Sequence, residues 1–341
     1  MVRELQKISF KQKSFIGYVF GIDIDDLDLT DASAVADFFN SNVIDPPVKI
    51  DYVIHCAAAT NTVAIEKDPL KYYASTVIAS KNVAESCAYN GIKLIHISTD
   101  YVLSELSPIG FCNTLVEFPV NQYGMHKLLA EKEVQLAYWK VGHPERLLIG
   151  RLSWLFGNSS NTFVEKLLKG ICKTYANAVK SGEKAKHKVV GDAFGKPTPV
   201  SLVLNKILDS IDNRRHGVVD FQYDGMQISR HEWAMMIWNA FCRIVEDNSI
   251  LEAKSISKQE HELLAKMTAA VSIEIIKSSD IDIGMRHPGL VQDNFKTCKN
   301  TSYSEYVECT DDYVCCNSKS LLSMALNSLK EEGLYEEVLQ R

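Results

Sequence analysis

Short apolar runs alternate with longer amphipathic segments through the first half of the chain. The apolar runs have the length of buried strands and lie at 15–22, 52–56, 94–97 and 147–152. Between them, apolar positions recur every three or four residues, which predicts helices at 31–42, 69–90 and 121–138. Gly91 follows the second of these segments, where a helix C-cap is expected. Strands and helices alternating at this spacing predict an α/β fold with a doubly wound parallel sheet.

The rhythm loosens beyond about Gly157. Helical periodicity continues at 162–172, 202–211, 229–245 and 258–267, and the segment 191–198 is rich in turn residues. A polar stretch at 300–317 predicts a loop before a final helix at 318–339. We therefore predict three parts. They are a sheet domain at 1–157, a smaller and mainly helical lobe at 158–295 with parts returning to the sheet, and a C-terminal loop and helix at 296–341.

The composition is that of a folded protein with a sizeable core. Hydrophobic residues make up 46% of the 341 residues, and charged residues make up 23%. The formal net charge is -6 and no long basic run occurs, so nucleic acid is not expected as a partner. No apolar run approaches membrane length, and the first residues do not form a signal peptide. We therefore expect no membrane partner and a cytoplasmic location.

Nine cysteines are scattered along the chain. Five have apolar neighbours in the sequence and are expected to be reduced core residues: Cys56, Cys87, Cys112, Cys172 and Cys242. Four crowd the tail without a CxxC spacing: Cys298, Cys309, Cys315 and Cys316. We predict no metal site from this arrangement.

The strongest chemical signal lies between residues 95 and 127. Thr99 and Asp100 follow an apolar strand, at the end where open α/β sheets place their chemistry. Tyr123 and Lys127 are four residues apart, so they share one face of the predicted helix. An ammonium beside the phenol would favour its ionised form and make it a usable acid near neutral pH. The phenol and the Thr99 hydroxyl could then deliver a proton to a carbonyl oxygen, as a reductase requires.

Two further stretches each have a functional and a structural interpretation. Asp23, at the end of the first apolar run, could accept hydrogen bonds from a ribose 2′-hydroxyl or belong to a solvated acidic turn. The small residues at 57–60 could let a flat ligand approach the backbone or could pack tightly against a helix. The sequence alone leaves both alternatives open.

Several motifs together resemble one family. They are Val53-Ile54-His55-Cys56-Ala57-Ala58, Ser98-Thr99-Asp100-Tyr101-Val102, Pro119 with Asn121 and Tyr123-Gly124, Lys127 with Glu131, Arg151-Leu152-Ser153-Trp154, and Phe194-Gly195-Lys196-Pro197-Thr198. Over about residues 1–290 the chain resembles the extended short-chain dehydrogenase/reductases, and within them the dTDP-4-dehydrorhamnose reductase family. That family includes the non-catalytic regulatory beta subunit of methionine adenosyltransferase. The resemblance implies a Rossmann-like dinucleotide-binding domain at 1–157 and a substrate-binding lobe at 158–295.

The resemblance also implies roles for individual residues. Tyr123 would donate a proton to a C4 keto oxygen, Lys127 would hold the nicotinamide ribose and lower the tyrosine pKa, and Thr99 would hydrogen-bond the same oxygen. The residues implied as contacts to the deoxysugar are Glu66, Thr99, Asp100, Tyr101 and Trp154. The residues implied as lining the cofactor, NADPH or NADH, are Asp23, Asp28, Leu29, Ala58, Ala59 and Thr60, together with Tyr123 and Lys127.

One part of the family pattern is missing. The family opens with an apolar strand and a Gly-x-x-Gly-x-x-Gly turn, whose backbone N–H groups hold the cofactor pyrophosphate. Here Glu4-Leu5-Gln6 matches the helix after that turn, so Val2 stands at the third glycine. Three explanations stay open: the protein continues upstream, cofactor binding has been lost, or another segment or subunit fills the gap. Thr76 also stands where the family usually has an asparagine.

The leading hypothesis is NAD(P)H-dependent reduction of a nucleotide-linked 4-keto-6-deoxysugar, in particular dTDP-4-dehydro-L-rhamnose to dTDP-L-rhamnose. The alternative is a non-catalytic regulatory subunit of methionine adenosyltransferase, which predicts association with the catalytic subunit and no turnover. A homodimer is a further expected assembly. Glu66, Asp100 and Trp154 favour the enzyme, because a purely regulatory subunit would not need the sugar contacts that the resemblance assigns to them.

Overall fold

The computed structural model describes most of the chain. The described residues are 19–40, 49–105, 115–157, 162–223, 227–247, 256–277 and 317–332, with 280, 310, 313–314 and 334. The chain divides into two compact units. Among the described residues, the first comprises those up to Ser153 together with Val200–Tyr223, and the second comprises Trp154–Pro199 with the described residues after Tyr223. Each unit is described separately below.

A parallel sheet forms the centre of the first unit. Its four strands are β1 (Tyr52–His55), β2 (Lys93–Thr99), β5 (Leu147–Leu152) and β10 (Gly217–Asp220), in that spatial order. Every neighbouring pair is parallel, and Ile95 of β2 lies between Ile54 and Leu148. The sheet that the sequence predicts is therefore confirmed. All four carboxyl ends point the same way, so the residues that follow β1 and β2 meet at one edge.

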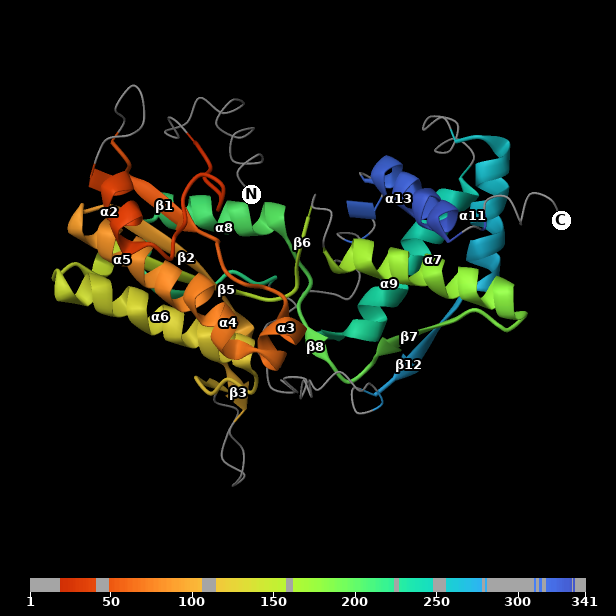
Figure 1. Ribbon diagram of the computed structural model, residues 1–341, viewed down its shortest axis with the longest axis horizontal. Coiled ribbons are helices and arrows are strands. Elements are labelled where there is room, and N and C mark those ends of the chain that lie inside the picture. The colour runs from red at the N-terminus through yellow and green to blue at the C-terminus, as the bar shows by residue number, and fades with distance from the viewer. Residues whose placement is uncertain are drawn as a thin grey trace. The chain divides into compact units, whose positions relative to one another are not determined.

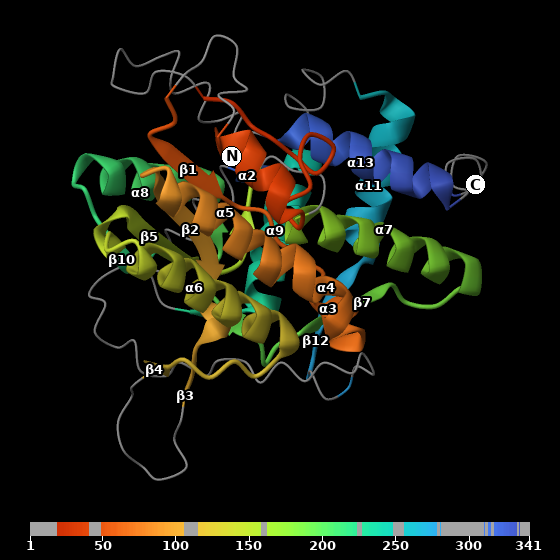
Figure 2. The ribbon, with the colours of Figure 1, turned by 60° about the vertical axis from the view of Figure 1, so that its left-hand side comes forward.

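Helices cover both faces of this sheet (Figure 1). On one face lie α2 (Ala32–Asn40), α5 (Ala79–Tyr89) and α6 (Gln122–Lys140), whose apolar side chains pack on Leu94 and Ile149. On the other face α8 (Val200–Asp212) packs Val203 and Ile207 against Ile95. Figure 2 shows α5 and α6 side by side, as their mutual contacts require. Alternate residues of the strands are thus buried on opposite faces, which produces the near-continuous apolar runs in the sequence.

The segment predicted as one helix at 69–90 is broken into three. It comprises α4 (Pro69–Tyr73), a π-helical turn (Ala74–Ile78) and α5. Gly91 ends it with a φ of 67°, which confirms the expected glycine cap. A further helix, α3 (Thr62–Lys67), precedes α4. It is too short for periodicity to predict.

Three expectations for the first unit need correction. Residues 19–22 form no strand, and the rest of the predicted strand at 15–22 lies outside the described residues. A strand needs a hydrogen-bonded neighbour, and no described strand pairs with this segment. Cys56 is exposed rather than a core residue, because it follows β1 at the edge of the sheet. The sequence also missed β10, whose Gly217 and Asp220 interrupt any apolar pattern.

The second unit is mainly helical. Its helices are α7 (Phe163–Ser181), α9 (Arg230–Glu246), α11 (Lys258–Ala270) and α13 (Ser318–Glu331), so the predicted helices are present and α7 is longer than predicted. Strand β7 (Lys186–Val190) pairs in parallel with β12 (Ser272–Ile276), which the sequence did not predict. The predicted loop at 191–198 contains the short strands β8 (Phe194–Gly195) and the start of β9 (Thr198–Pro199). Strand β8 pairs with β11 (Ile228–Ser229), and β9 pairs with β6 (Leu155–Phe156).

Two further expectations concern ligand classes and the tail. In the described part of the chain, no helix is long and apolar enough to cross a membrane. No cluster of three potential metal ligands occurs among the described residues. The four tail cysteines, Cys112 and most of the predicted loop at 300–317 lie outside the described residues.

The packing of β5 against Phe221 gives a test of the core. A Cβ added at Gly150 would lie 2.1 Å from the Phe221 ring. Gly150→Ala is expected to reduce the free energy of unfolding by about 1–3 kcal/mol, because the buried ring has to shift. Urea unfolding measures the loss. Adding Phe221→Leu makes room for the methyl group, so the double variant should lose less than the sum of the two single variants. A Gly150→Ala variant as stable as the wild type would contradict this packing.

Candidate active site

The carboxyl end of β2 places two buried polar side chains at the edge of the sheet. Thr99 is the last residue of β2, and Asp100 begins a 3-10 turn (Asp100–Val102). The Thr99 hydroxyl donates to the Asp100 carboxylate at 3.1 Å and accepts from the Tyr101 N–H at 3.3 Å. The threonine therefore caps the turn, and both side chains have fixed positions.

The start of α6 is held against this turn by three features. The Asn121 side chain accepts from the Gly124 N–H at 2.7 Å and so caps the helix. Glu66 of α3 accepts from the Gln122 N–H at 2.9 Å. A Cβ at Gly124 would lie 2.3 Å from the Tyr101 carbonyl oxygen, so only glycine allows this approach. The resemblance implies that Glu66 contacts the sugar. In the structure, one of its carboxylate oxygens binds the N-terminus of α6.

Tyr123, in the first turn of α6, reaches the residues that follow β2. Its ring packs edge-on against Tyr101, with 5.9 Å between the ring centroids. Its hydroxyl lies close to the Thr99 side chain. Burial raises the pKa of the Tyr123 phenol, and the nearby acids Asp100 and Tyr101 raise it further, against the opposing effect of Thr99. The predicted lowering of this pKa by Lys127 is therefore wrong for the structure, and the phenol is neutral at physiological pH.

Lys127 is buried one turn after Tyr123. Its amine donates to the Ile97 carbonyl oxygen of β2 at 2.7 Å. Burial lowers the pKa of this amine to about 8, although the Glu131 carboxylate opposes the shift. The amine is thus turned to the strand, which explains why it does not lower the pKa of the phenol. An ammonium has three N–H donors, so it can bind a further acceptor beside the strand carbonyl.

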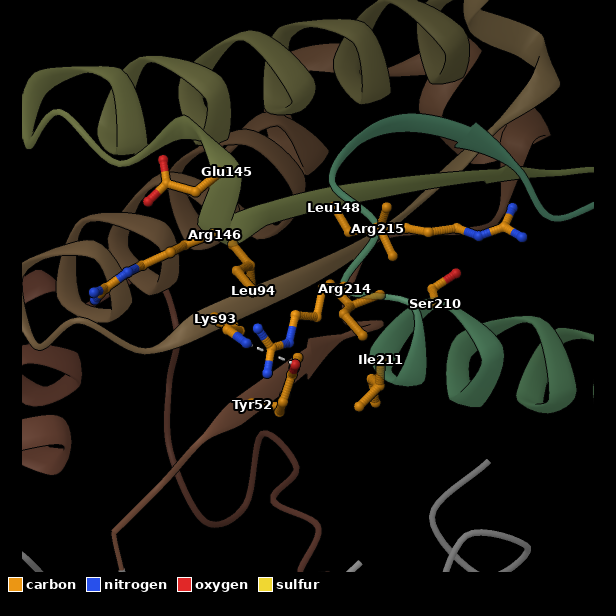
Figure 3. A pocket seen from close by; sticks show the side chains of 11 residues that line it. Tyr52, Lys93, Leu94, Glu145, Arg146, Leu148, Ser210, Ile211, Arg214 and Arg215 are labelled. Atoms are coloured by element: carbon orange, nitrogen blue, oxygen red, sulfur yellow. Dashed lines mark hydrogen bonds between the residues drawn. The ribbon is translucent and has the colours of Figure 1, made fainter. Parts of the chain in front are cut away.

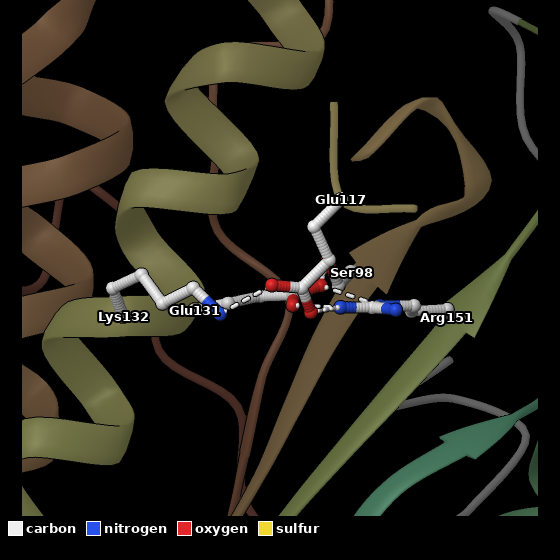
Figure 4. Close-up of polar contacts among 5 residues, drawn as sticks. All are labelled: Ser98, Glu117, Glu131, Lys132 and Arg151. Carbon is white, nitrogen blue, oxygen red and sulfur yellow. Dashed lines mark hydrogen bonds and ion pairs between the residues drawn. The ribbon is translucent and has the colours of Figure 1, made fainter. Parts of the chain in front are cut away.

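A buried ion-pair network holds the same helix one turn further on (Figure 4). Glu131 is fully buried and accepts from the Ser98 hydroxyl of β2. The Arg151 guanidinium of β5 binds both Glu131 oxygens, at 3.0 Å from Nε and 2.6 Å from Nη2. Arg151 also binds Glu117 at 2.6 Å, and Glu117 binds Lys132. Glu131 and Arg151 belong to the motifs that carry the resemblance, but the sequence did not predict the ion pair between them.

The residues predicted to line the cofactor lie in different segments of the first unit. Ala58 and Ala59 are half-buried just after β1, and Thr60 is exposed. Thr76 accepts from the Ala59 N–H at 3.2 Å, so the threonine at the atypical position supports this loop.

The predicted acidic cofactor contacts lie in the turn before α2. The Asp23 carboxylate accepts from the Ile24 N–H at 2.7 Å, and the Asp28 carboxylate accepts from the Thr30 N–H at 2.9 Å. Leu29 packs on the core around α2 and α5. Asp23 and Asp28 are exposed. Their carboxylates therefore stabilise the turn and are also accessible to solvent.

Two buried histidines under the site were not predicted to take part. His55 ends β1, and His96 lies beside it on β2 with 5.4 Å between the ring centroids. The His55 ring contacts the Ser80 hydroxyl at 3.1 Å, whereas the His96 ring nitrogens have no partner among the described residues. Burial, with the charge of Lys127, lowers the pKa of both imidazoles, to about 3 for His55. A histidine within each of these two apolar runs is the feature of the sequence that could have pointed to this pair.

Trp154 belongs to the second unit and has a strained backbone. Its φ is 34°, in the left-handed region that non-glycine residues rarely adopt. The Arg230 guanidinium lies 3.6 Å from its ring centroid, and Trp233 stacks with it at 5.6 Å. A Cβ at Gly195 would lie 2.3 Å from the indole. An aromatic ring held in this strained conformation is a feature of ligand sites.

Comparisons with known proteins assign the family. A family model described as RmlD substrate binding domain matches residues 3–266. The chain belongs to this family. Proteins named dTDP-4-dehydrorhamnose reductase are similar to it in sequence. The protein of Aggregatibacter actinomycetemcomitans is 24% identical over 270 residues, which cover 76% of this chain and 82% of that protein. That of Sinorhizobium fredii is 30% identical over 119 residues, 35% of this chain and 38% of that protein.

In several relatives the match covers only part of the relative's length. The chain spans 50% of the Mycolicibacterium smegmatis dTDP-4-dehydrorhamnose reductase, at 30% identity. Among solved structures, the Clostridium acetobutylicum dTDP-4-dehydrorhamnose reductase has a TM-score of 0.64 at 24% identity, and covers 93% of this chain and 95% of that chain. The Bacillus anthracis dTDP-4-dehydrorhamnose reductase, solved in complex with NADP, has a TM-score of 0.58 at 25% identity and covers 83% of both chains. The Rossmann-like fold is thus confirmed.

The Glu131 network gives a stability prediction. Glu131→Ala leaves a largely buried guanidinium with only the more exposed Glu117, so the free energy of unfolding should fall by about 3 kcal/mol or more in urea unfolding. Glu85 is the control, because its side chain is 44% exposed and pairs with Lys140 at 3.7 Å. Glu85→Ala should change stability by about 0.5 kcal/mol or less. Equal losses in the two variants would contradict the importance of the buried pair.

Asp100 gives a prediction about pH. Burial raises its pKa to about 6, against the hydrogen bonds of Ser153 and Thr99. The unfolded carboxyl ionises near pH 4, so between about pH 4 and 6 the folded state binds more protons and stability falls as pH rises. Asp100→Asn should therefore be about 2–3 kcal/mol more stable than the wild type at pH 7 and lose this advantage near pH 4.

Urea unfolding at each pH measures this difference, with the exposed Asp25→Asn as the control for surface charge. A difference between Asp100→Asn and the wild type that is the same at every pH would contradict the raised pKa.

Proposed function

We propose that this chain reduces the C4 ketone of a nucleotide-linked 4-keto-6-deoxysugar, in particular dTDP-4-dehydro-L-rhamnose to dTDP-L-rhamnose. The observation that carries the proposal is the pair of hydroxyls at the carboxyl end of β2. The Tyr123 and Thr99 side chains lie close together there, and Lys127 lies one helical turn away. The family and the names of its relatives support the substrate class.

The proton for the ketone oxygen comes from Tyr123. A proton donor has to carry its proton at the working pH, as a tyrosine phenol does at neutral pH. In the chain without ligands the Thr99 hydroxyl donates to Asp100 at 3.1 Å. With substrate bound, this hydroxyl would turn to donate to the same oxygen, where negative charge develops as hydride arrives. Both hydroxyls would then bind one oxygen, and Tyr123 would protonate it.

The residues around the first unit's sheet edge fit the nicotinamide end of a dinucleotide. NADPH or NADH would supply the hydride. Lys127 would hold the ribose hydroxyls with the N–H groups that Ile97 does not use. Ala58 and Ala59 have small side chains and let a flat ring approach the end of β1, with Thr76 fixing the loop.

The proposed sugar contacts lie in the first unit. In the first unit Asp100 and Tyr101 flank the two hydroxyl donors. Glu66 has one oxygen on the α6 N-terminus, and its other oxygen is the proposed acceptor for a sugar hydroxyl. The sugar contact that the resemblance assigns to Trp154, in the second unit, stays a prediction.

Replacing the phenol tests the proposal directly. Tyr123→Phe should lower kcat for dTDP-4-dehydrorhamnose with NADPH by about 10²–10⁴-fold, because only the proton donor is lost. The wild type should bind the product dTDP-rhamnose about as tightly as the variant does. Tyr89→Phe is the control, since Tyr89 is 82% exposed on α5, and its kcat should match the wild type.

The outcomes separate the two functions. Turnover that survives Tyr123→Phe would contradict the role of the phenol. A wild-type chain that turns over neither NADPH nor NADH and instead co-purifies with the catalytic subunit of methionine adenosyltransferase would support the regulatory alternative.

A further inference from the structure

A pocket lies in the first unit at the opposite edge of the sheet from Thr99 (Figure 3). Tyr52 and Lys93, the first residues of β1 and β2, line it together with the end of α8. Lys93 and Thr99 are separated by the whole length of β2, which is about 20 Å for a strand of this length. The pocket is therefore separate from the candidate active site.

Two cations converge in this pocket. The Lys93 amine pairs with no carboxylate among the described residues, and it donates to the Tyr52 hydroxyl at 3.0 Å. Figure 3 shows the Arg214 guanidinium turned toward that amine and hydroxyl. Arg214 has no ion pair or hydrogen bond from its side chain to any described residue. Like charges repel, so their convergence favours a bound anion.

The other charged groups of the pocket do not neutralise this pair. Glu145 contacts the His143 ring at 3.0 Å, Arg146 donates to the Gly91 carbonyl at 2.8 Å, and Arg215 is paired with Asp209 at 3.0 Å. Figure 3 shows the side chains of Glu145 and Arg215 pointing away from Arg214. The pocket therefore presents two positive charges and a hydroxyl without an opposing carboxylate among the described residues.

The backbone places Arg214 at a position that normally belongs to glycine. Arg214 has a φ of 51°, and its N–H donates to the Ile211 carbonyl at 3.2 Å. The next N–H, of Arg215, donates to the Ser210 carbonyl at 2.8 Å. These two bonds form a Schellman cap on α8, whose left-handed residue is usually glycine. The chain thus keeps a guanidinium at this point despite an unfavourable backbone conformation.

We propose that this pocket binds the phosphate group of a small molecule, through the Arg214 guanidinium, the Lys93 ammonium and the Tyr52 hydroxyl. Guanidinium and ammonium groups together match a phosphate that carries close to two negative charges. The guanidinium fork binds two oxygens, and the lysine and tyrosine donate to the remaining ones. Inorganic phosphate, a sugar phosphate and a diphosphate share this chemistry.

Calorimetric titration with inorganic phosphate at constant ionic strength tests the site. The wild type should bind phosphate, and Arg214→Gly and Lys93→Met should each weaken the binding by about tenfold or more. Arg214→Gly is suited to the test, because glycine removes the cation and fits the left-handed backbone, so the fold should be kept. Arg215→Gln is the matched control, since its partner is Asp209, and it should bind phosphate within about twofold of the wild type.

Parallel titrations with glucose 1-phosphate and pyrophosphate identify the source of the phosphate, since the preferred ligand should show the largest loss in Arg214→Gly. Tyr123→Phe should bind phosphate as the wild type does, so the result does not depend on the proposed reduction. Binding that is unchanged in Arg214→Gly and Lys93→Met, or a wild type that binds none of the three compounds, would overturn the proposal.

Discussion

The attachment of α6 to β2 is the constraint on which the rest of the candidate site depends. The Lys127 amine binds the Ile97 carbonyl, and one turn later Glu131 binds Ser98 of the same strand. At the other end, Gly124 allows the helix to touch the Tyr101 backbone. The helix is thus fixed to the strand along its first three turns, and Tyr123 has little freedom. A ketone reductase needs its proton donor fixed in this way, because rate depends on positioning.

Burial sets the protonation of the site. It raises the pKa of Tyr123 and of Asp100, and it lowers the pKa of Lys127. Each shift favours the neutral form, because a region of low dielectric disfavours charge. A neutral phenol carries the proton that a ketone oxygen would accept, but its raised pKa makes it a weaker acid than a free phenol. The sequence argument required the opposite shift, since spacing along a helix brings two residues to one face but does not tell where the amine points.

Much of the architecture could be predicted from the sequence. The buried runs at 52–56, 94–97 and 147–152 became strands because both faces of a covered parallel sheet are apolar. Strand β10 was not predictable, because its exposed edge position tolerates Asp220. The pairing of β7 with β12 joins segments far apart in the chain, and single-sequence patterns carry no information on such pairs.

The site residues stay a prediction, and their geometry could not be read from the sequence. Thr99, Tyr123 and Lys127 lie within one unit around the end of β2, as motif and spacing indicated. The roles of Glu66 and Thr76 as hydrogen-bond acceptors for backbone N–H groups depend on tertiary contacts, so the sequence could not reveal them. The central claim is that one oxygen of the substrate sits between the two hydroxyls.

A crystal structure of the chain with NADP and dTDP-rhamnose tests this claim most directly. The Tyr123 and Thr99 hydroxyls should both lie within about 3 Å of the sugar O4. A sugar bound with O4 beyond hydrogen-bonding reach of both hydroxyls would contradict it.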